Sequence, residues 1–166
     1  GSEMCIRDRG YPLVRLEDGE LLRCEHATAL VKGERRRAVI GDVVEVAVPP
    51  AHDKGVIEAI APRTREFVRK DPTERAVPQV LAANFERVIV AQPVGEVNLR
   101  RLERELVLAF ETGAEVTVVL TKADLADDAA TRATVEAVQA LAALAADVLV
   151  VSEDDPASVE ACLLYT

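Results

Sequence analysis

The sequence predicts an α/β protein whose N-terminal domain is all β: a small barrel of short strands, followed by a parallel βαβαβ sheet. Short strands separated by turns fill the first half of the chain, whereas continuous apolar runs alternate with amphipathic helices in the second. The charge changes along with this pattern. Residues 10–75 hold 12 basic and 12 acidic side chains, and residues 76–161 hold 6 basic and 15 acidic ones. Such asymmetry indicates two modules with different partners.

Length and composition exclude several classes of protein. The 166 residues are 49% hydrophobic, which is enough for one globular core or two small ones. No apolar run approaches the roughly 18 residues that a membrane-spanning helix needs, so we expect no membrane association. The net charge of −9 argues against nucleic-acid binding over the whole surface, although it permits a local basic patch.

Both ends of the chain read as translations of one inverted DNA segment. A DNA sequence that encodes Met4 to Arg9 has a reverse complement that encodes Cys162 to Thr166. We therefore expect residues 1–9 and 162–166 to be sequencing-adapter-derived and non-native, with the native chain truncated at both ends. Cys24 is then the one native cysteine, which fits a reducing, cytoplasmic setting.

The first domain is expected over residues 10–62. Turn residues delimit its strands: Asp18-Gly19 forms a hairpin turn, Gly41-Asp42 leads into a strand, and prolines follow the last two strands. The strands are expected at 13–16, 21–24, 41–48 and 55–60. Because a closed sheet removes exposed edges, a barrel is the economical arrangement, and the OB-fold is the leading candidate.

Basic side chains cluster in this first half. Loops at one rim of an OB barrel commonly bind nucleic acid, so these residues are candidate contacts with RNA phosphates. A solvated loop and a charged linker explain the same pattern equally well. The candidates are Lys32, Arg35, Arg36, Arg37, Arg63 and Arg65. Residues 63–79 lack periodicity and are expected to form the linker between the domains.

The second domain is expected over residues 80–161, with strands at 88–91, 116–120 and 148–151 as buried apolar runs. Asn98 can cap a helix that ends near Gly113, and Asp127 or Asp128 can begin the next one. The order βαβαβ implies a parallel sheet with right-handed crossovers. Ligands of such sheets bind at the carboxyl ends of the strands.

Polar residues follow two of these strands directly. Thr121, Lys122 and Asp124 come after the middle strand, and Ser152 comes after the third. A carboxylate at Asp124 can accept hydrogen bonds from the ring N–H and the exocyclic amino group of guanine, whereas adenine has no such pair of donors. The Lys122 stem can lie against the base, Thr121 can tie the loops together, and Ser152 can fix a loop whose backbone N–H meets the guanine oxygen. In the alternative, purely structural interpretation, Asp124 caps a helix and Lys122 is solvated.

These motifs resemble those of the circularly permuted, ribosome small-subunit-dependent GTPase A family. The resemblance rests on the joint order of four segments in this sequence: 41–46, 79–84, 98–104 and 120–125. No Gly-x-x-x-x-Gly-Lys-Ser/Thr phosphate loop precedes Thr121-Lys122-Ala123-Asp124, which is the order that a circular permutation produces. Glu153 departs from the Ala that is usual after the serine of the second loop.

The resemblance implies a partial OB-fold barrel followed by half of a P-loop-type GTPase sheet. It further implies binding of the 30S subunit and 16S rRNA, GTP or GDP as the nucleotide, and GTP hydrolysis during late small-subunit maturation by a monomeric parent. The Mg²⁺ and Zn²⁺ of that parent would bind through regions beyond this chain. We therefore expect this fragment to be catalytically inactive, with no catalytic residue and no metal ligand of its own.

Two other functions fit the sequence less specifically. The chain could be a non-catalytic OB-fold RNA-binding adaptor fused to an α/β domain that binds no nucleotide. An enzyme that acts on a small metabolite at the sheet edge has only the βαβαβ pattern in its favour.

Overall fold

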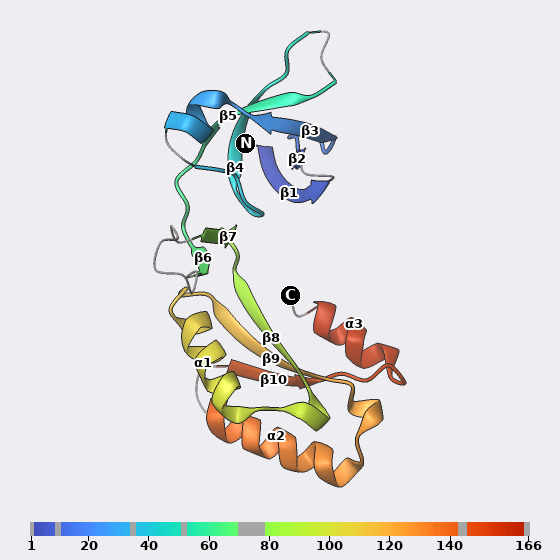
Figure 1. Ribbon diagram of the computed structural model, residues 1–166. Coiled ribbons are helices and arrows are strands. Elements are labelled where there is room, and N and C mark those ends of the chain that lie inside the picture. Colours follow the sequence, from blue (N-terminus) through green and yellow to red (C-terminus); the bar gives the residue numbers. More distant parts are fainter. Residues whose placement is uncertain are drawn as a thin grey trace. The chain divides into compact units, whose positions relative to one another are not determined.

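The computed structural model describes residues 2–8, 11–33, 36–50, 53–69, 79–142 and 146–164. The chain divides into two compact units, Gly1–Phe85 and Glu86–Thr166 (Figure 1). The division falls six residues beyond the expected start of the second domain at residue 80. Each unit has its own hydrophobic core, so each is described separately.

The first unit is built around a closed barrel of five strands. They are β1 (Ser2–Asp8), β2 (Tyr11–Arg15), β3 (Leu21–His26), β4 (Val43–Ala47) and β5 (Gly55–Ile60), in the order β1-β2-β3-β5-β4. The four strands expected from the sequence are confirmed. The buried core residues of this unit are Met4, Val14, Cys24, Ala38, Val44 and Ile57. A short π-helical turn, η1 (Ala29–Gly33), follows β3.

The barrel is closed, whereas the sequence predicted a partial one. The difference is β1, which comes from residues expected to be adapter-derived. This strand pairs with β2 along most of its length and with β4 through Ser2 and Glu3. Met4 is only 2% exposed. Closing the sheet removes two exposed edges and buries this side chain, and the folded unit therefore begins before residue 10.

Part of the expected linker 63–79 pairs with the residues that follow it in a two-stranded antiparallel sheet. Its strands are β6 (Glu66–Arg69) and β7 (Gln79–Ala83), and residues 70–78 lie outside the described part of the chain. The Ala83 N–H donates to the Ile40 carbonyl over 2.9 Å, so this hairpin is bonded to the barrel turn before β4. The pairing joins segments too far apart for local periodicity to reveal.

The second unit is a three-stranded parallel sheet with helices, as predicted. Its elements are β8 (Arg87–Pro93), η2 (Val94–Glu96), α1 (Leu99–Phe110), β9 (Glu115–Thr121), η3 (Ala123–Leu125), α2 (Asp128–Ala142), β10 (Ala146–Val150) and α3 (Pro156–Leu164). The strand order is β10-β9-β8, with β9 in the middle. The Asn98 side chain caps α1 by accepting from the Arg101 N–H at 3.1 Å.

One face of this sheet carries the core of the second unit. Val90, Val118 and Leu120 pack against Leu102 of α1 and Val138 of α2. All five residues of β9 from Val116 to Leu120 are buried, which explains their continuous apolar run. Because β9 and β10 are parallel neighbours in this sheet, the loops that follow them begin at the same edge.

Candidate functional site

The carboxyl ends of β9 and β10 bring two polar loops together. The strands run parallel, and Val150 lies beside Leu120 at their ends. Two backbone hydrogen bonds then join the loops: the Val151 N–H donates to the Leu120 carbonyl at 2.8 Å, and the Ala123 N–H donates to the Val151 carbonyl at 3.3 Å. Segments 121–125 and 151–155 therefore form one edge site, as the order of elements predicts.

Lys122 has a left-handed backbone, with φ of +57° and ψ of +38°. This conformation costs a residue with a Cβ about 1 kcal/mol or more, and such strain concentrates at functional sites. The Lys122 carbonyl accepts from the Leu125 N–H at 3.1 Å, and the side chain is exposed. The strained turn leads β9 directly into η3, which carries Asp124.

Asp124 connects the two loops through its carboxylate. Its Oδ1 accepts from the Glu153 N–H at 3.1 Å and lies 3.5 Å from the Ser152 hydroxyl. Its other oxygen, Oδ2, accepts no hydrogen bond from the described residues. The side chain is half-buried. One carboxylate oxygen thus holds the second loop, and the other can accept from a ligand.

The second loop is closed by hydrogen bonds of its own. The Asp154 N–H donates to the Ser152 hydroxyl at 3.2 Å, and the Asp155 N–H donates to the Ser152 carbonyl at 3.2 Å. Ser158, in the first turn of α3, bonds both ends of the loop. Its hydroxyl accepts from the Ser152 N–H at 3.2 Å and donates to the Asp155 carbonyl at 2.6 Å. Sequence reasoning missed Ser158, because a serine inside a helix gives no distinctive signal.

The four residues expected to bind guanine therefore meet at one edge, although Thr121 differs from its expected role. Its hydroxyl makes no hydrogen bond to the described residues, so it does not tie the loops together. The two backbone hydrogen bonds between the loops do so instead. A backbone link of this kind cannot be read from side-chain identity.

Some of the candidate RNA-binding residues of the first unit are exposed, and others are bonded to neighbouring residues. Lys32 in η1 is exposed, as are Arg36 and Arg37 in the segment before β4. Arg35 lies outside the described residues. Arg65 is half-buried and donates from Nη1 to the Phe85 carbonyl at 3.5 Å. The exposed candidates for phosphate contacts are thus Lys32, Arg36 and Arg37.

Arg63, a predicted RNA contact, lies in a buried ion pair in the structure. Its side chain is 8% exposed and pairs with the fully buried Asp42 through Nε–Oδ1 at 2.7 Å and Nη2–Oδ2 at 2.8 Å. Nη1 also bonds Glu66 at 3.0 Å. The hydrogen bonds to Asp42 raise the pKa of Arg63 above its ordinary value. A guanidinium held in this way has no free fork for a phosphate.

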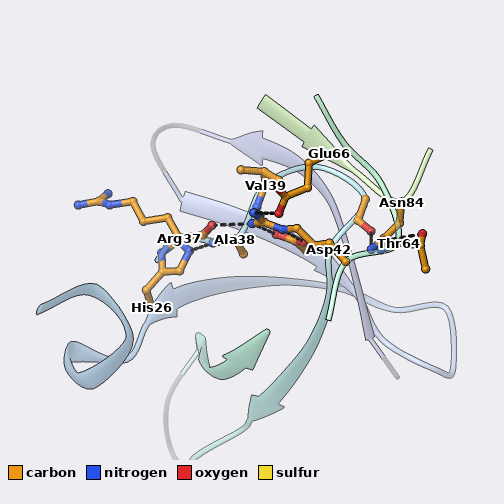
Figure 2. Close-up of polar contacts among 10 residues, drawn as sticks. His26, Arg37, Ala38, Val39, Asp42, Thr64, Glu66 and Asn84 are labelled. Atoms are coloured by element: carbon orange, nitrogen blue, oxygen red, sulfur yellow. Dashed lines mark hydrogen bonds and ion pairs between the residues drawn. The ribbon is translucent and has the colours of Figure 1, made fainter. Parts of the chain in front are cut away.

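The same cluster fixes the backbone that carries Arg37. Asp42 Oδ2 accepts from the Val39 N–H at 2.8 Å, and His26 Nε2 accepts from the Ala38 N–H at 2.9 Å (Figure 2). Nearby, the Asn84 amide donates to the Gly41 carbonyl at 2.8 Å and accepts from the Thr64 N–H at 2.8 Å. Sequence reasoning placed Asp42 in a turn and did not find this cluster, because its members come from four separate segments.

Two further observations limit the chemistry of the described residues. Among them no group of three or more His, Cys, Asp and Glu side chains could hold a metal ion, and no helix is long and apolar enough to cross a membrane. Cys24 is fully buried, and burial raises the pKa of its thiol above the ordinary value, against a smaller opposite effect of a backbone hydrogen bond with Gly55. A buried thiol of this kind is a core residue and not a nucleophile.

Curated relatives share the sequence over most of this chain. The small ribosomal subunit biogenesis GTPase RsgA of Streptomyces avermitilis is 42% identical over 125 residues, which cover 75% of this chain and 33% of that protein. The protein of the same name from Streptomyces coelicolor is 38% identical over 148 residues, or 89% of this chain and 40% of that protein. The chain thus spans about a third to two fifths of the length of these relatives.

Two solved structures share the fold across 99% of this chain. The crystal structure of YjeQ from Thermotoga maritima has a TM-score of 0.74 at 22% identity, and that of YloQ, a circularly permuted GTPase, has 0.69 at 19% identity. In both cases the match covers 55% of the solved chain. The family model described as RsgA GTPase matches residues 60–164, well over half of the sequence. The chain therefore belongs to the RsgA GTPase family.

Proposed function

We propose that the edge formed by Thr121, Lys122, Asp124 and Ser152 binds the guanine base of GTP or GDP. The observation that carries this proposal is the half-buried Asp124 carboxylate, which lies between the two loops at the carboxyl end of the middle strand. A carboxylate there can accept from both N1–H and the exocyclic amino group of guanine. Adenine has an acceptor at N1, so it would face the carboxylate with a lone pair.

The other residues of the site have supporting roles. Lys122, on its strained turn, can lay its aliphatic stem along the base and extend its ammonium toward ribose or loop oxygens. Ser152 orders the second loop by accepting from the Asp154 N–H. Thr121 ends β9 and gives the turn its starting point. The site is built for recognition of a base and contributes no group to phosphate chemistry.

The test is a titration of this chain with nucleoside monophosphates, followed by amide chemical shifts. GMP is expected to shift the amides of 121–125 and 151–155, with binding in the millimolar range because the phosphates find no partner here. AMP is expected to leave them in place at the same concentration. Equal responses to GMP and AMP would contradict guanine recognition and would favour the RNA-binding adaptor.

We further infer that the chain is part of a GTPase that acts on the small ribosomal subunit. The relatives bear that function in their names, and the exposed Lys32, Arg36 and Arg37 supply phosphate contacts suited to 16S rRNA in the 30S subunit. Arg35 and Arg65 remain in the proposed set. Such a parent would act in the cytoplasm as a monomer, with Mg²⁺ and Zn²⁺ bound by residues outside this chain.

The chain itself is proposed to be catalytically inactive. Its 166 residues contain no Gly-x-x-x-x-Gly-Lys-Ser/Thr loop to hold the β- and γ-phosphates. Positioning and charge stabilisation of the transferred phosphoryl group therefore have no residues to provide them. A GTP turnover assay of the purified chain is expected to show only the uncatalysed rate. Turnover that Asp124→Ala abolishes would contradict this.

A further inference from the structure

We propose that the guanine site is occupied by the protein itself before nucleotide binds, through the hydrogen bond from the Glu153 N–H to Asp124. Guanine binding would break this bond and give both the Asp124 carboxylate and the Glu153 N–H a new partner on the base. The inference rests on the guanine assignment above and adds a closed state and an exchange step to it.

The closed state follows from the donors of the second loop. We expect the guanine O6 to accept from a backbone N–H of this loop, yet all four N–H groups from Ser152 to Asp155 donate within the chain. Three of them donate to Ser158, to the Ser152 hydroxyl and to the Ser152 carbonyl. The fourth, on Glu153, donates to Asp124 Oδ1 at 3.1 Å. The loop as described has no donor left for O6.

Of these four bonds, the one from Glu153 is the bond that guanine can replace without loss. Opening it leaves one acceptor, Asp124 Oδ1, and one donor, the Glu153 N–H. The guanine edge presents the matching set, with N1–H and N2–H as donors and O6 as acceptor. N1–H and N2–H would bond the two carboxylate oxygens, and O6 would take the released Glu153 N–H. One internal bond is exchanged for three to the base.

Ser158 confines the movement to the middle of the loop. Its hydroxyl binds the Ser152 N–H at one end and the Asp155 carbonyl at the other, so both ends stay attached to α3. The Ser152 and Asp155 backbones also form a β-bridge. The Glu153 peptide can then turn away from Asp124 while its flanks keep their bonds. Ser158 is thus a positioning residue for the loop.

The exchange sharpens selectivity for guanine. Adenine has no O6 to accept from the Glu153 N–H, and its N1 presents a lone pair to the Asp124 carboxylate. Binding of adenine would therefore break the bond between Glu153 and Asp124 and leave both groups without a good partner. The exchange also lowers the apparent affinity for every base, because only the open fraction of molecules binds. Glu153 therefore contributes through its backbone, and its unusual side chain is not required.

Amide hydrogen exchange of the full 166-residue chain tests the closed state without nucleotide. In Asp124→Ala the Glu153 N–H loses its acceptor, and its exchange is expected to accelerate about fivefold, as for the loss of one hydrogen bond. Asp124→Asn keeps an oxygen acceptor, so exchange within twofold of the unaltered chain is expected. Asp128→Asn is the matched control, with the same loss of charge four residues away. Unchanged exchange of Glu153 in Asp124→Ala would overturn the closed state.

A second pair of variants tests the exchange step with GMP as the probe. Glu153→Ala keeps the N–H and is expected to bind GMP within twofold of the unaltered chain. Glu153→Pro removes the N–H, so O6 loses its donor, and a loss of affinity of about fivefold or more is expected. Equal GMP affinity of the two variants would overturn the exchange.

The two proposals fail in different ways. If GMP shifts no amide of the two loops, guanine recognition itself is wrong. If GMP shifts them while Glu153 exchanges equally fast in the unaltered chain and in Asp124→Ala, guanine recognition stands and only the self-occupied state is wrong.

Discussion

At the scale of single residues, the buried ion pair of Asp42 and Arg63 is sensitive to substitution, because the loss of one partner leaves the other charge buried and unpaired. Asp42 is 0% exposed and Arg63 8% exposed at the side chain, so neither charge can be hydrated if its partner is lost. The bidentate geometry, together with the bonds to Val39 and Glu66, compensates their desolvation. The pair therefore holds the barrel turn and the segment after β5 in one arrangement.

Replacing Arg63 by Ala is expected to destabilise the first unit by about 3–5 kcal/mol, because Asp42 would remain buried without a partner. Urea unfolding followed at amide resonances of the barrel measures the change. Arg36→Ala removes an exposed arginine and is expected to alter the stability by less than about 0.5 kcal/mol. Similar small effects of both replacements would show that the pair is not a structural one.

Cys24 is expected to resist modification in the folded protein. Burial raises the pKa of its thiol, so less thiolate forms at a given alkaline pH, and access to it is closed. Because the pKa of the thiol is raised in the folded state, Cys24 contributes to the stability of the folded protein below the ordinary thiol pKa. This contribution is lost as the pH rises through the pKa of the folded state. Iodoacetamide labelling at pH 8, read by mass spectrometry, should modify the half-buried Cys162 well before Cys24. Comparable rates in the absence of denaturant would contradict this.

The places of residues could be predicted where a motif ties identity to position. Asp124 and Ser152 were expected together because each comes soon after a buried strand, and the structure brings them to one edge. The ion pair of Arg63 was not predicted, because a sequence shows a positive charge without its partner and Asp42 lies 21 residues away. Ser158 and the backbone N–H of Glu153 carried no signal, since their importance comes from hydrogen-bond geometry.

At the scale of elements, the turn before β4 lies close to the β6–β7 hairpin. Gly41 has φ of +87°, and a Cβ at this position would lie 1.9 Å from the Ala83 carbonyl oxygen. The Asn84 amide also donates to the Gly41 carbonyl at 2.8 Å. Only glycine satisfies both the left-handed backbone and the close approach.

Gly41→Ala is expected to destabilise the first unit much more than Gly19→Ala does. Gly19 has a similar φ of +88° but open space where its Cβ would lie, so its replacement isolates the backbone cost of about 1 kcal/mol. The Gly41 replacement adds a clash with backbone, for which a further 2 kcal/mol or more is expected. Urea midpoints of the two variants give the comparison, and equal midpoints would refute the close approach.

Elements with strong local patterns were predicted well, and those defined by distant pairing were not. The apolar runs of β8, β9 and β10 and the stripes of α1 and α2 fixed the second unit. In contrast, β6 lies in the expected linker and β7 almost entirely at the start of the expected second domain, and both gain their structure from pairing with each other and from the Ile40 contact. The strand β1 was left out of the predicted barrel because its residues were expected to be adapter-derived, yet its pairing with β2 and β4 closes the barrel.

At the scale of the whole molecule, the charge asymmetry matches the different partners that we propose for the two units. The first unit carries the exposed residues Lys32, Arg36 and Arg37, and the second carries the edge proposed to bind guanine and the acidic excess. Phosphate contacts release counterions from RNA, so their number is measurable from the salt dependence of binding. The chain can therefore be tested for RNA binding separately from its base recognition.

Replacing Arg36 and Arg37 together by Ala is expected to reduce the salt slope of RNA binding by about 1.4 to 1.8, at 0.7 to 0.9 for each phosphate contact. Fluorescence anisotropy with a labelled 16S rRNA hairpin, from 50 to 200 mM salt, measures the slope. Arg132→Ala, on α2 of the second unit, is the control and should leave it unchanged. An unaltered slope in the double variant would remove these arginines from the interface.

The most direct test of the account is a reversal of base preference by one substitution. Asp124→Asn exchanges one carboxylate oxygen for an amide donor, which suits the carbonyl of xanthine at the position of the guanine amino group. The unaltered chain is expected to bind GMP in preference to XMP, and the variant XMP in preference to GMP, each by about tenfold or more in titrations followed at the loop amides. A variant that still prefers GMP would contradict the claim that Asp124 reads the base.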